Sequence, residues 1–290
     1  MSLTLDQRTN LDGFPKAAEL IEITGTSALE ASDRATINLL YQFAHESSRI
    51  SDPTAIFELP ITDLLFSSHT STDRIRETLA RILAIQVHVN IKHPRTGHPA
   101  LLLTHLFTSF IIPEKAMPGS PATVQYRVPP DLLPILLQSN RWGRIKAEIV
   151  CAMSSKYAIS LYELIQLRAN MDRCIEIFPI VRFRELLGVP PGTYTDGTGF
   201  VRKVINPATL EVNGLSDMGV KIEVNRRSSR APIETVTVAW WRQTDDEYRA
   251  SLKERNQPKA GRSARLRGSA ERMLPGQMEL ESYLASRSQT

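Results

Sequence analysis

The sequence predicts an α+β protein with two tandem winged helix-turn-helix domains and a disordered basic C-terminal tail. Three observations lead to this prediction. A helix, a strand, two further helices and a β-hairpin can be parsed in that order between Ser154 and Trp240. The same order recurs between Ser32 and Ile111. Beyond Tyr248 the composition becomes basic, contains Gly and Ser, and is nearly free of aromatic residues, which is typical of disorder.

Length and charge agree with such a protein. A chain of 290 residues favours about two domains, and 42% hydrophobic residues can bury real cores. The net charge is only +4, and eight basic residues against two acidic ones give +6 between Arg249 and Met273 alone. The rest of the chain therefore carries about −2, so the folded body must concentrate its positive charge locally.

The two cysteines, Cys151 and Cys174, are too few for a disulfide framework or a zinc site, which indicates a reducing compartment. No apolar run approaches the roughly 18 residues of a membrane span, and the N-terminus has no signal-peptide pattern. We therefore expect a cytoplasmic protein without membrane contact.

The upstream elements begin after a polar lead, residues 1–30, in which we expect little order. Ile37, Leu40, Tyr41 and Ala44 then mark one face of a helix. The expected elements of this domain are a helix at 32–48, a strand at 57–59, a short helix at 61–66, a helix capped by Ser71 that ends near 83, and strands at 85–91 and 101–111 around the turn HPRTGHP.

A strand at 123–128 and a helix at 130–137 close the first domain, because Pro is well tolerated at a helix start. A connecting helix is expected at 143–153. The predicted division is 1–30 for the lead, 31–142 for the first winged-helix domain, 143–245 for the second, and 246–290 for the flexible basic tail.

The second domain is the more clearly patterned. Ser155 caps a helix whose apolar positions recur at helical spacing, and a strand follows at 174–178. The next helix ends at Gly188, where glycine allows the left-handed turn. A third helix is expected at 198–212, and a hairpin at 218–224 and 233–240.

The third helix of this domain carries residues suited to base contact. Arg can pair with guanine and Asn with adenine, and Arg202, Lys203 and Asn206 lie in its exposed N-terminal half, after Thr198. A solvated charged face is the alternative interpretation. Pro207 lies inside this helix, where proline is normally unfavourable, and we expect a bend there.

Further candidate DNA contacts lie on the hairpin and in the first domain. Arginines at a wing typically bind phosphate rather than read sequence. The hairpin candidates are Lys221, Arg226, Arg227 and Arg230, and those of the first domain are Ser71, Thr72, Arg74 and Arg76. For the first domain, surface charge without a DNA role is the alternative.

Catalytic signatures are absent from the sequence: it has no GxxxxGK, HExxH, GxSxG or GxGxxG motif. Tyr157 and Tyr162 fit the packed face of a helix, and no His-hydrophobe-His pair accompanies them as in nicking enzymes. The four histidines of the first hairpin have no carboxylate or thiol at ligand spacing, so we interpret them as polar wing residues: His88, His93, His98 and His105. No catalytic residue, metal or cofactor is expected.

Several motifs also carry a family resemblance. SKYAISLYEL, LLGV, FVRKVINPATLEVN and SDMGVKIEV, in this order, resemble the second winged-helix domain of the iteron-binding plasmid replication initiators. In that family the first motif opens the domain, and the third forms its recognition helix. VPPDLLPILL resembles the segment that closes the first domain.

The resemblance implies a protein that binds repeated double-stranded origin DNA as a monomer and helps to open an AT-rich region. It also implies a homodimer, in equilibrium with the monomer, that represses its own promoter, and recruitment of a host initiator and helicase. The alternative is a winged-helix transcriptional repressor that binds an inverted repeat. Near the C-terminus, QMEL resembles the start of a sliding-clamp ligand, although Glu281 departs from that motif; an amphipathic last turn or plain disorder is the alternative.

Overall fold

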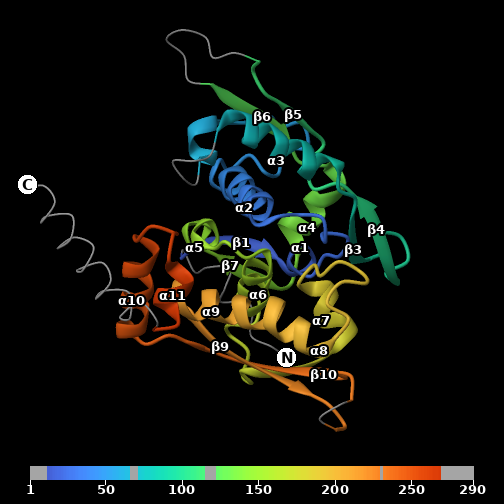
Figure 1. Ribbon diagram of the computed structural model, residues 1–290. Helices are drawn as coiled ribbons and strands as arrows, with labels where there is room; N and C mark the ends of the chain where they lie inside the picture. Colours follow the sequence, from blue (N-terminus) through green and yellow to red (C-terminus); the bar gives the residue numbers. More distant parts are fainter. Residues whose placement is uncertain (1–11, 66–70, 115–121, 229–230, 269–290) are drawn as a thin grey trace, which may run out of the picture.

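The chain folds into two halves, one above the other in Figure 1. The computed structural model describes residues 12–65, 71–114, 122–228 and 231–268. The upper half and the layer between the halves contain β1 (Phe14–Ala17), α1 (Ala18–Ile21), α2 (Ala31–Glu46), β2 (Phe57–Pro60), η2 (Ile61–Leu64), α3 (Thr72–Ala84), β3 (Val87–Lys92), β4 (Pro99–Thr104), β5 (Ser109–Ile111), β6 (Thr123–Arg127), η3 (Pro130–Leu132), α4 (Leu133–Gln138) and β7 (Trp142–Ile145). The remaining elements are α5 (Ala147–Ala152), α6 (Lys156–Gln166), β8 (Ile175–Pro179), α7 (Ile180–Leu186), α8 (Gly197–Phe200), η4 (Val201–Ile205), α9 (Asn206–Leu215), β9 (Met218–Asn225), β10 (Thr235–Arg242), α10 (Asp245–Arg255) and α11 (Arg262–Leu266).

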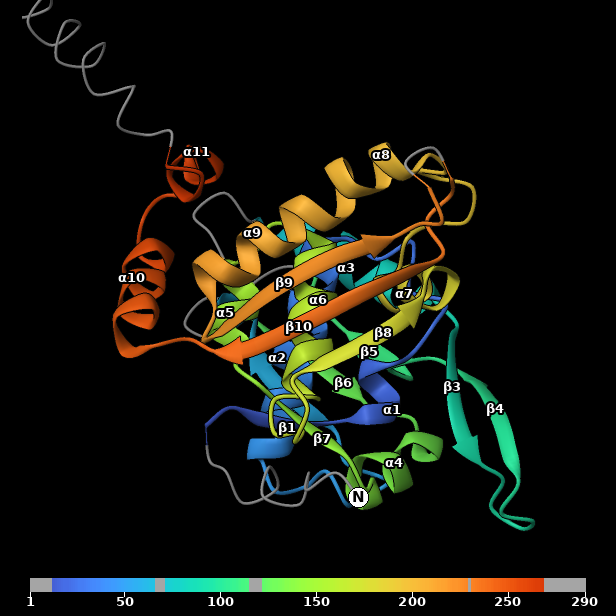
Figure 2. The same cartoon turned by 90° about the horizontal axis from the view of Figure 1, so that it is seen from below.

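The lower half is a winged helix-turn-helix unit, as the sequence predicts. The helix α6, the strand β8, the helices α7 and α8–α9, and the β9–β10 hairpin follow one another in the predicted order. The three strands form an antiparallel sheet in the order β8–β10–β9, which crosses the front of this half in Figure 2. Val220, Val236 and Val238 turn inward from this sheet and are buried in the core.

The long third helix contains a wide turn ahead of its proline. The segments α8, η4 and α9 run continuously from Gly197 to Leu215, and residues 201–205 are π-helical. There the amide of Asn206 donates to the carbonyl of Val201, five residues back instead of four. Pro207 has no amide proton, and its ring conflicts with the carbonyl four residues earlier. A π-helical turn therefore accommodates the proline where the sequence predicts a bend.

The upper half repeats the same plan with an insertion. The helix α2, the strand β2 and the helices η2 and α3 are followed by the sheet β2–β6–β5, whose strand order matches β8–β10–β9. The hairpin β3–β4 forms a separate two-stranded sheet that projects from the body in Figure 2. The wing of the upper half is therefore formed by β5 and β6, which correspond to β9 and β10.

The sequence-based assignment of the first wing to residues 85–111 is consequently wrong. The expected strand 101–111 is two strands, β4 and β5, which belong to different sheets. Leu106 and Phe107 lie between them and are only 2% and 0% exposed. Because two adjacent side chains enter the core, the alternation of a single strand cannot continue through them.

Residues 12–30, where little order was expected, are folded into the centre of the molecule. The strand β1 pairs antiparallel with β7, with Phe14 opposite Ile145 and Ala17 opposite Trp142. All four side chains are buried. The expected connecting helix at 143–153 is likewise wrong at its start, because residues 143–145 belong to β7 and only α5 is helical. Residues 1–11 lie outside the described part of the chain.

The predicted tail is folded up to residue 268. Thr244 and Glu247 form a capping box that starts α10, which α11 follows. Leu266 of α11 packs so closely on Gly214 that any side chain at position 214 would collide with it. The prediction of disorder from residue 246 is therefore wrong for 246–268, and residues 269–290 lie outside the described part.

The two halves share one continuous core. The apolar residues of both units and of the β1–β7 layer form a single buried cluster. At its centre the Glu163 carboxylate of α6 lies 2.7 Å from the Lys16 amine of β1 and accepts a 2.6 Å hydrogen bond from Asn38 of α2. A buried polar network thus joins the lower half to the upper one.

Candidate nucleic-acid interface

The helix α8–α9 divides its residues sharply between core and solvent. Phe200, Val204 and Ala208 are buried at intervals of four residues. The π-helical turn keeps them on one face, because a regular helix of 3.6 residues per turn would rotate them progressively. Arg202 and Lys203 are consequently exposed on the opposite face. Thr198 and Asn206, also predicted as contacts, are exposed as well.

Arg184 contacts both the turn before this helix and the first turn of the helix itself. Its guanidinium lies 4.8 Å from the centre of the Phe200 ring and donates to the carbonyls of Thr193 and Tyr194. Tyr194 has a φ of 48°, in the left-handed region that residues other than glycine rarely adopt. Arg184 therefore fixes a strained turn at the start of the candidate recognition helix. Nothing in the local sequence pattern singles out either residue.

The wing brings one of its arginines to this helix. The guanidinium of Arg226 lies so close to Gly197 that a side chain at that position would collide with it, and it donates to the carbonyl of Ala231. Arg227 is more exposed and pairs with Glu234 at 2.6 Å. Arg230 lies outside the described residues. The wing therefore contributes Arg226 directly beside α8.

Lys221, by contrast, lies away from the helix. Val220 faces the core, so the neighbouring Lys221 points to the outer face of the sheet, where its amine pairs with Glu223 at 2.8 Å. Because the helices cover the inner face, Lys221 and the recognition helix do not form one surface.

The candidates on α3 are partly engaged within the protein. Ser71 caps the helix by accepting from the amide of Arg74, and Thr72 is exposed. Arg76 bonds to Asp73 at 2.7 Å and to the carbonyls of Pro113 and Glu114 at 2.8 and 2.9 Å. Arg76 thus ties α3 to the chain that follows β5, and Arg74 is exposed beside it.

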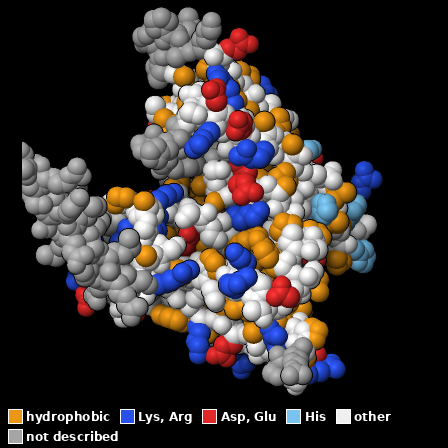
Figure 3. Space-filling model, in the orientation of Figure 1, with side chains coloured by type: hydrophobic (Ala, Val, Ile, Leu, Met, Phe, Trp, Pro, Cys, Tyr) orange, Lys and Arg blue, Asp and Glu red, His pale blue; other side chains and the backbone are white. Residues whose placement is uncertain are grey.

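Both candidate helices lie on the same side of the molecule. In Figure 1, α3 faces the viewer in the upper half and α8–α9 in the lower half. Figure 3 shows that Lys and Arg side chains follow the middle of this face from top to bottom, with acidic side chains between them. The positive charge is thus concentrated locally, as the small net charge of the chain requires.

The basic residues after β10 mostly support the fold. Arg255 donates to the carbonyl of Leu215 at the end of α9, while Lys259 and Arg262 donate to those of Cys151 and Ala152 at the end of α5. Arg265 forms hydrogen bonds with Glu254, which hold the pKa of that carboxyl below its usual value. Arg255, Lys259 and Arg262 thus cap helix ends, and Arg265 pairs with a carboxylate, so these four side chains do not form part of a flexible basic tail.

The candidate tyrosines are buried in the fold, and His93 is hydrogen-bonded within a turn. Tyr157 is 8% exposed and Tyr162 is fully buried, which confirms their place on a packed helix face, and burial raises the pKa of the Tyr162 hydroxyl. His93 accepts hydrogen bonds from the amides of Arg95 and Thr96 and so shapes the β3–β4 turn.

Within the described residues, no three side chains of His, Cys, Asp or Glu gather as a metal site would require. None of the described helices has the length and apolar character needed to cross a membrane.

Comparisons with known proteins agree with this architecture. Residues 15–166 match the family model described as "Initiator Replication protein, WH1", and residues 179–238 match "Initiator Rep protein, WH2". The crystal structure of the Pi initiator protein in complex with iteron DNA is similar to this fold with a TM-score of 0.58 at 16% identity, over 81% of this chain and all of that one. The WH1 domain of a replication protein isolated from a multiple sclerosis patient aligns with a TM-score of 0.30 at 13% identity, over 41% of this chain and 86% of that one. No curated protein sequence matches. With two winged-helix units in the predicted order and both family models matched in sequence, the chain belongs to the initiator replication protein family.

Proposed function

We propose that this protein is a plasmid replication initiator that binds direct repeats, or iterons, in double-stranded origin DNA. The observation that carries the proposal is the placement of two helix-turn-helix units in one chain, with α3 and α8–α9 on one side of the molecule. The fold similarity to the Pi initiator, whose structure contains iteron DNA, supports it.

In this proposal the protein acts mechanically and not as an enzyme. The helices α3 and α8–α9 enter successive major grooves, which lie about 10.5 bp apart, so one protomer covers roughly 20 bp. Arg202 and Asn206 read bases, because their side chains match guanine and adenine edges. Lys203, Arg226 and Arg227 bind phosphates and set the position of the helix.

The contribution of the upper half follows from its geometry. Thr72 and Arg74 lie exposed in the first turn of α3, where recognition helices contact bases. Ser71 and Arg76 have a positioning role in this proposal, since one caps α3 and the other joins it to the chain after β5. Lys221 contributes only through the general field of the protein, because it faces away from the helix.

Further partners belong to the same proposal. A homodimer in equilibrium with the monomer would repress the protein's own promoter, and the bound protein would recruit a host initiator and helicase. The QMEL segment, which is a candidate ligand for a sliding clamp, lies outside the described residues.

The test is a footprint of the full chain on DNA that contains direct repeats of about 20 bp, taken from the region flanking its gene. We expect protection of each repeat by one protomer, with two protected major grooves on one face of the duplex. Protection of an inverted repeat alone would identify a transcriptional repressor instead. Equal affinity for the repeats and for random DNA would contradict both functions.

A further inference from the structure

The strand β8 forms one edge of its sheet and has an open backbone. Trp240 donates to the carbonyl of Cys174, and Ile180 donates to that of Glu234, each at 3.0 Å. These bonds direct the even-numbered residues of β8 toward β10, because alternate residues of an antiparallel strand bond to opposite sides. The amides and carbonyls of Ile175 and Ile177 therefore point away from the sheet, and they have no backbone partner within the described chain.

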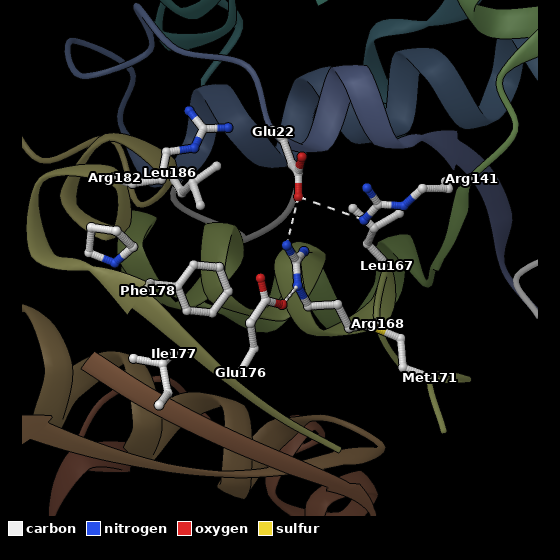
Figure 4. A pocket seen from close by; sticks show the side chains of 11 residues that line it. Glu22, Arg141, Leu167, Arg168, Met171, Glu176, Ile177, Phe178, Arg182 and Leu186 are labelled. Carbon is white, nitrogen blue, oxygen red and sulfur yellow. Dashed lines mark hydrogen bonds and ion pairs between the residues drawn. The ribbon is translucent and has the colours of Figure 1, made fainter. Parts of the chain in front are cut away.

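A cavity of about 500 Å³ lies beside this edge, at the boundary between the two halves (Figure 4). Arg168 occupies its floor and is only 5% exposed. Its guanidinium bonds to Glu22 of the upper half at 2.7 Å and to Glu176 of β8 at 2.6 Å. One guanidinium thus bridges the two carboxylates of the cavity and balances the charge of one of them.

Two further arginines reach the cavity from other sides and are less fully paired. The guanidinium of Arg141 lies 3.8 Å from Glu22, a carboxylate that Arg168 already holds more closely. Arg182 lies 3.6 Å from Glu185 in a solvent-accessible pair along one helix, an arrangement that contributes little. The cavity lining therefore has three guanidiniums against two carboxylates, a net charge of +1, which favours a ligand that brings a carboxylate.

The outer face of the same edge is apolar. Ile175 and Ile177 are 53% and 62% exposed, and Trp241 of the neighbouring strand is 44% exposed. Because side chains of a strand alternate between faces, Glu176 and Phe178 lie on the inner face of the sheet and the two isoleucines on the outer face. Ile177, on this edge strand, also lines the cavity. The edge thus has a cationic side and an apolar side.

The geometry points to a docking site at which β8 takes up an extended acidic segment of a partner protein as an additional strand. The backbone of that segment bonds to Ile175 and Ile177 in the manner of strand addition. Its carboxylates, on alternate residues, face Arg141 and Arg182, and its apolar side chains cover the two isoleucines. A second copy of β8 fits less well, since it would bring another set of these arginines against the first.

A peptide of alternating leucine and glutamate, blocked at both ends and labelled with fluorescein, tests this site on the full chain. Its control carries lysine in place of each glutamate. We expect the glutamate peptide to bind at least about tenfold more tightly, because only its charge complements the cavity. The double variant Arg141→Glu, Arg182→Glu should reverse that preference. Equal binding of the two peptides would overturn the proposal.

A second pair of variants tests the strand edge itself. Ile177→Pro removes an amide that faces away from β10, whereas Ile177→Thr keeps it. Binding of the glutamate peptide should fall at least about tenfold in the proline variant only, since proline cannot donate to an added strand. An unchanged melting temperature and unchanged DNA binding check the fold. Peptide binding that survives in the proline variant excludes strand addition, and a protein dimer that this variant abolishes would identify a second copy as the occupant.

Discussion

Arg202 and Arg76, both predicted as DNA contacts, differ in how many bonds they form within the protein. Arg202 is exposed on the recognition helix and has no hydrogen-bond or ion-pair partner among the described residues, whereas Arg76 bonds to one side chain and two carbonyls. A side chain without internal partners can form new bonds without breaking old ones. Arg202 is therefore the better candidate for reading a base.

Replacing Arg202 with alanine should weaken binding to the cognate repeat by about 1–3 kcal/mol, the usual value of a specific base contact. It should also relax the preference at one or two base pairs, which competition with single-base variants of the repeat measures. Arg227→Ala is the control, and it should weaken cognate and random DNA about equally, because phosphate contacts carry no sequence information. Full affinity of Arg202→Ala for the repeat would show that the assigned recognition surface is wrong.

The exposure of Arg202 could be predicted because the apolar positions around it follow a helical period. The ion pair of Lys221 could also be predicted from the sequence. Alternate residues share a face of a strand, so Glu223 lies beside Lys221 and pairs with it. The engagement of Arg76 could not be predicted, since its carbonyl partners lie 37 and 38 residues away in the sequence. Such contacts depend on tertiary packing, which no local pattern encodes.

At the scale of elements, long patterned helices were predicted well and short strands poorly. The helix around Arg202 has capping residues and apolar positions at helical spacing over nineteen positions, from Gly197 to Leu215. The strand β1 has four residues, and its partner β7 lies more than a hundred positions away. Its place in the core follows from pairing and not from its own sequence. The hairpin β3–β4 was predicted as a hairpin, but only the sheet order shows that it is not the wing.

Pro207 offers a test of the π-helical turn. Alanine at this position restores an amide donor and favours a regular helix, which would rotate the residues before it by about 100° relative to α9. We expect Pro207→Ala to fold but to lose most of its preference for the cognate repeat over random DNA. Melting temperature and the ratio of the two affinities are the measurements. An unchanged ratio would show that core packing and not the proline sets the turn.

The α10–α11 segment should respond to acid through Glu254. Bonds from Arg265 hold the pKa of this carboxyl below its ordinary value, so its contribution to stability is complete above about pH 4.5 and is lost as the pH falls through the folded-state pKa. Glu254→Gln should therefore release α11 already at neutral pH. Amide hydrogen exchange in residues 262–266 measures this release, with Glu247→Gln, which removes a capping contact of α10, as the control. Equal protection of α11 in the parent and in Glu254→Gln would contradict the role of the ion pair.

At the scale of the whole molecule, the two winged-helix units behave as one body. They share the β1–β7 layer and a single core, and the network of Lys16, Asn38 and Glu163 crosses between them. This arrangement suits the proposed function, because two recognition helices can select a fixed spacing of grooves only when their separation is fixed. It also means that neither half is expected to unfold alone.

Glu163→Ala tests this unity. The change leaves the Lys16 ammonium buried without its carboxylate, and loss of one partner of a buried pair costs about 3–5 kcal/mol. Because the lost contacts belong to both halves, amide exchange in α2 and α6 should accelerate together, and thermal unfolding should remain a single transition at a lower temperature. The double variant Lys16→Met, Glu163→Leu removes both charges and should recover a large part of the loss, which a double-mutant cycle measures. Protection that persists in α2 while α6 opens would show instead that the halves are separate domains joined by a dispensable contact.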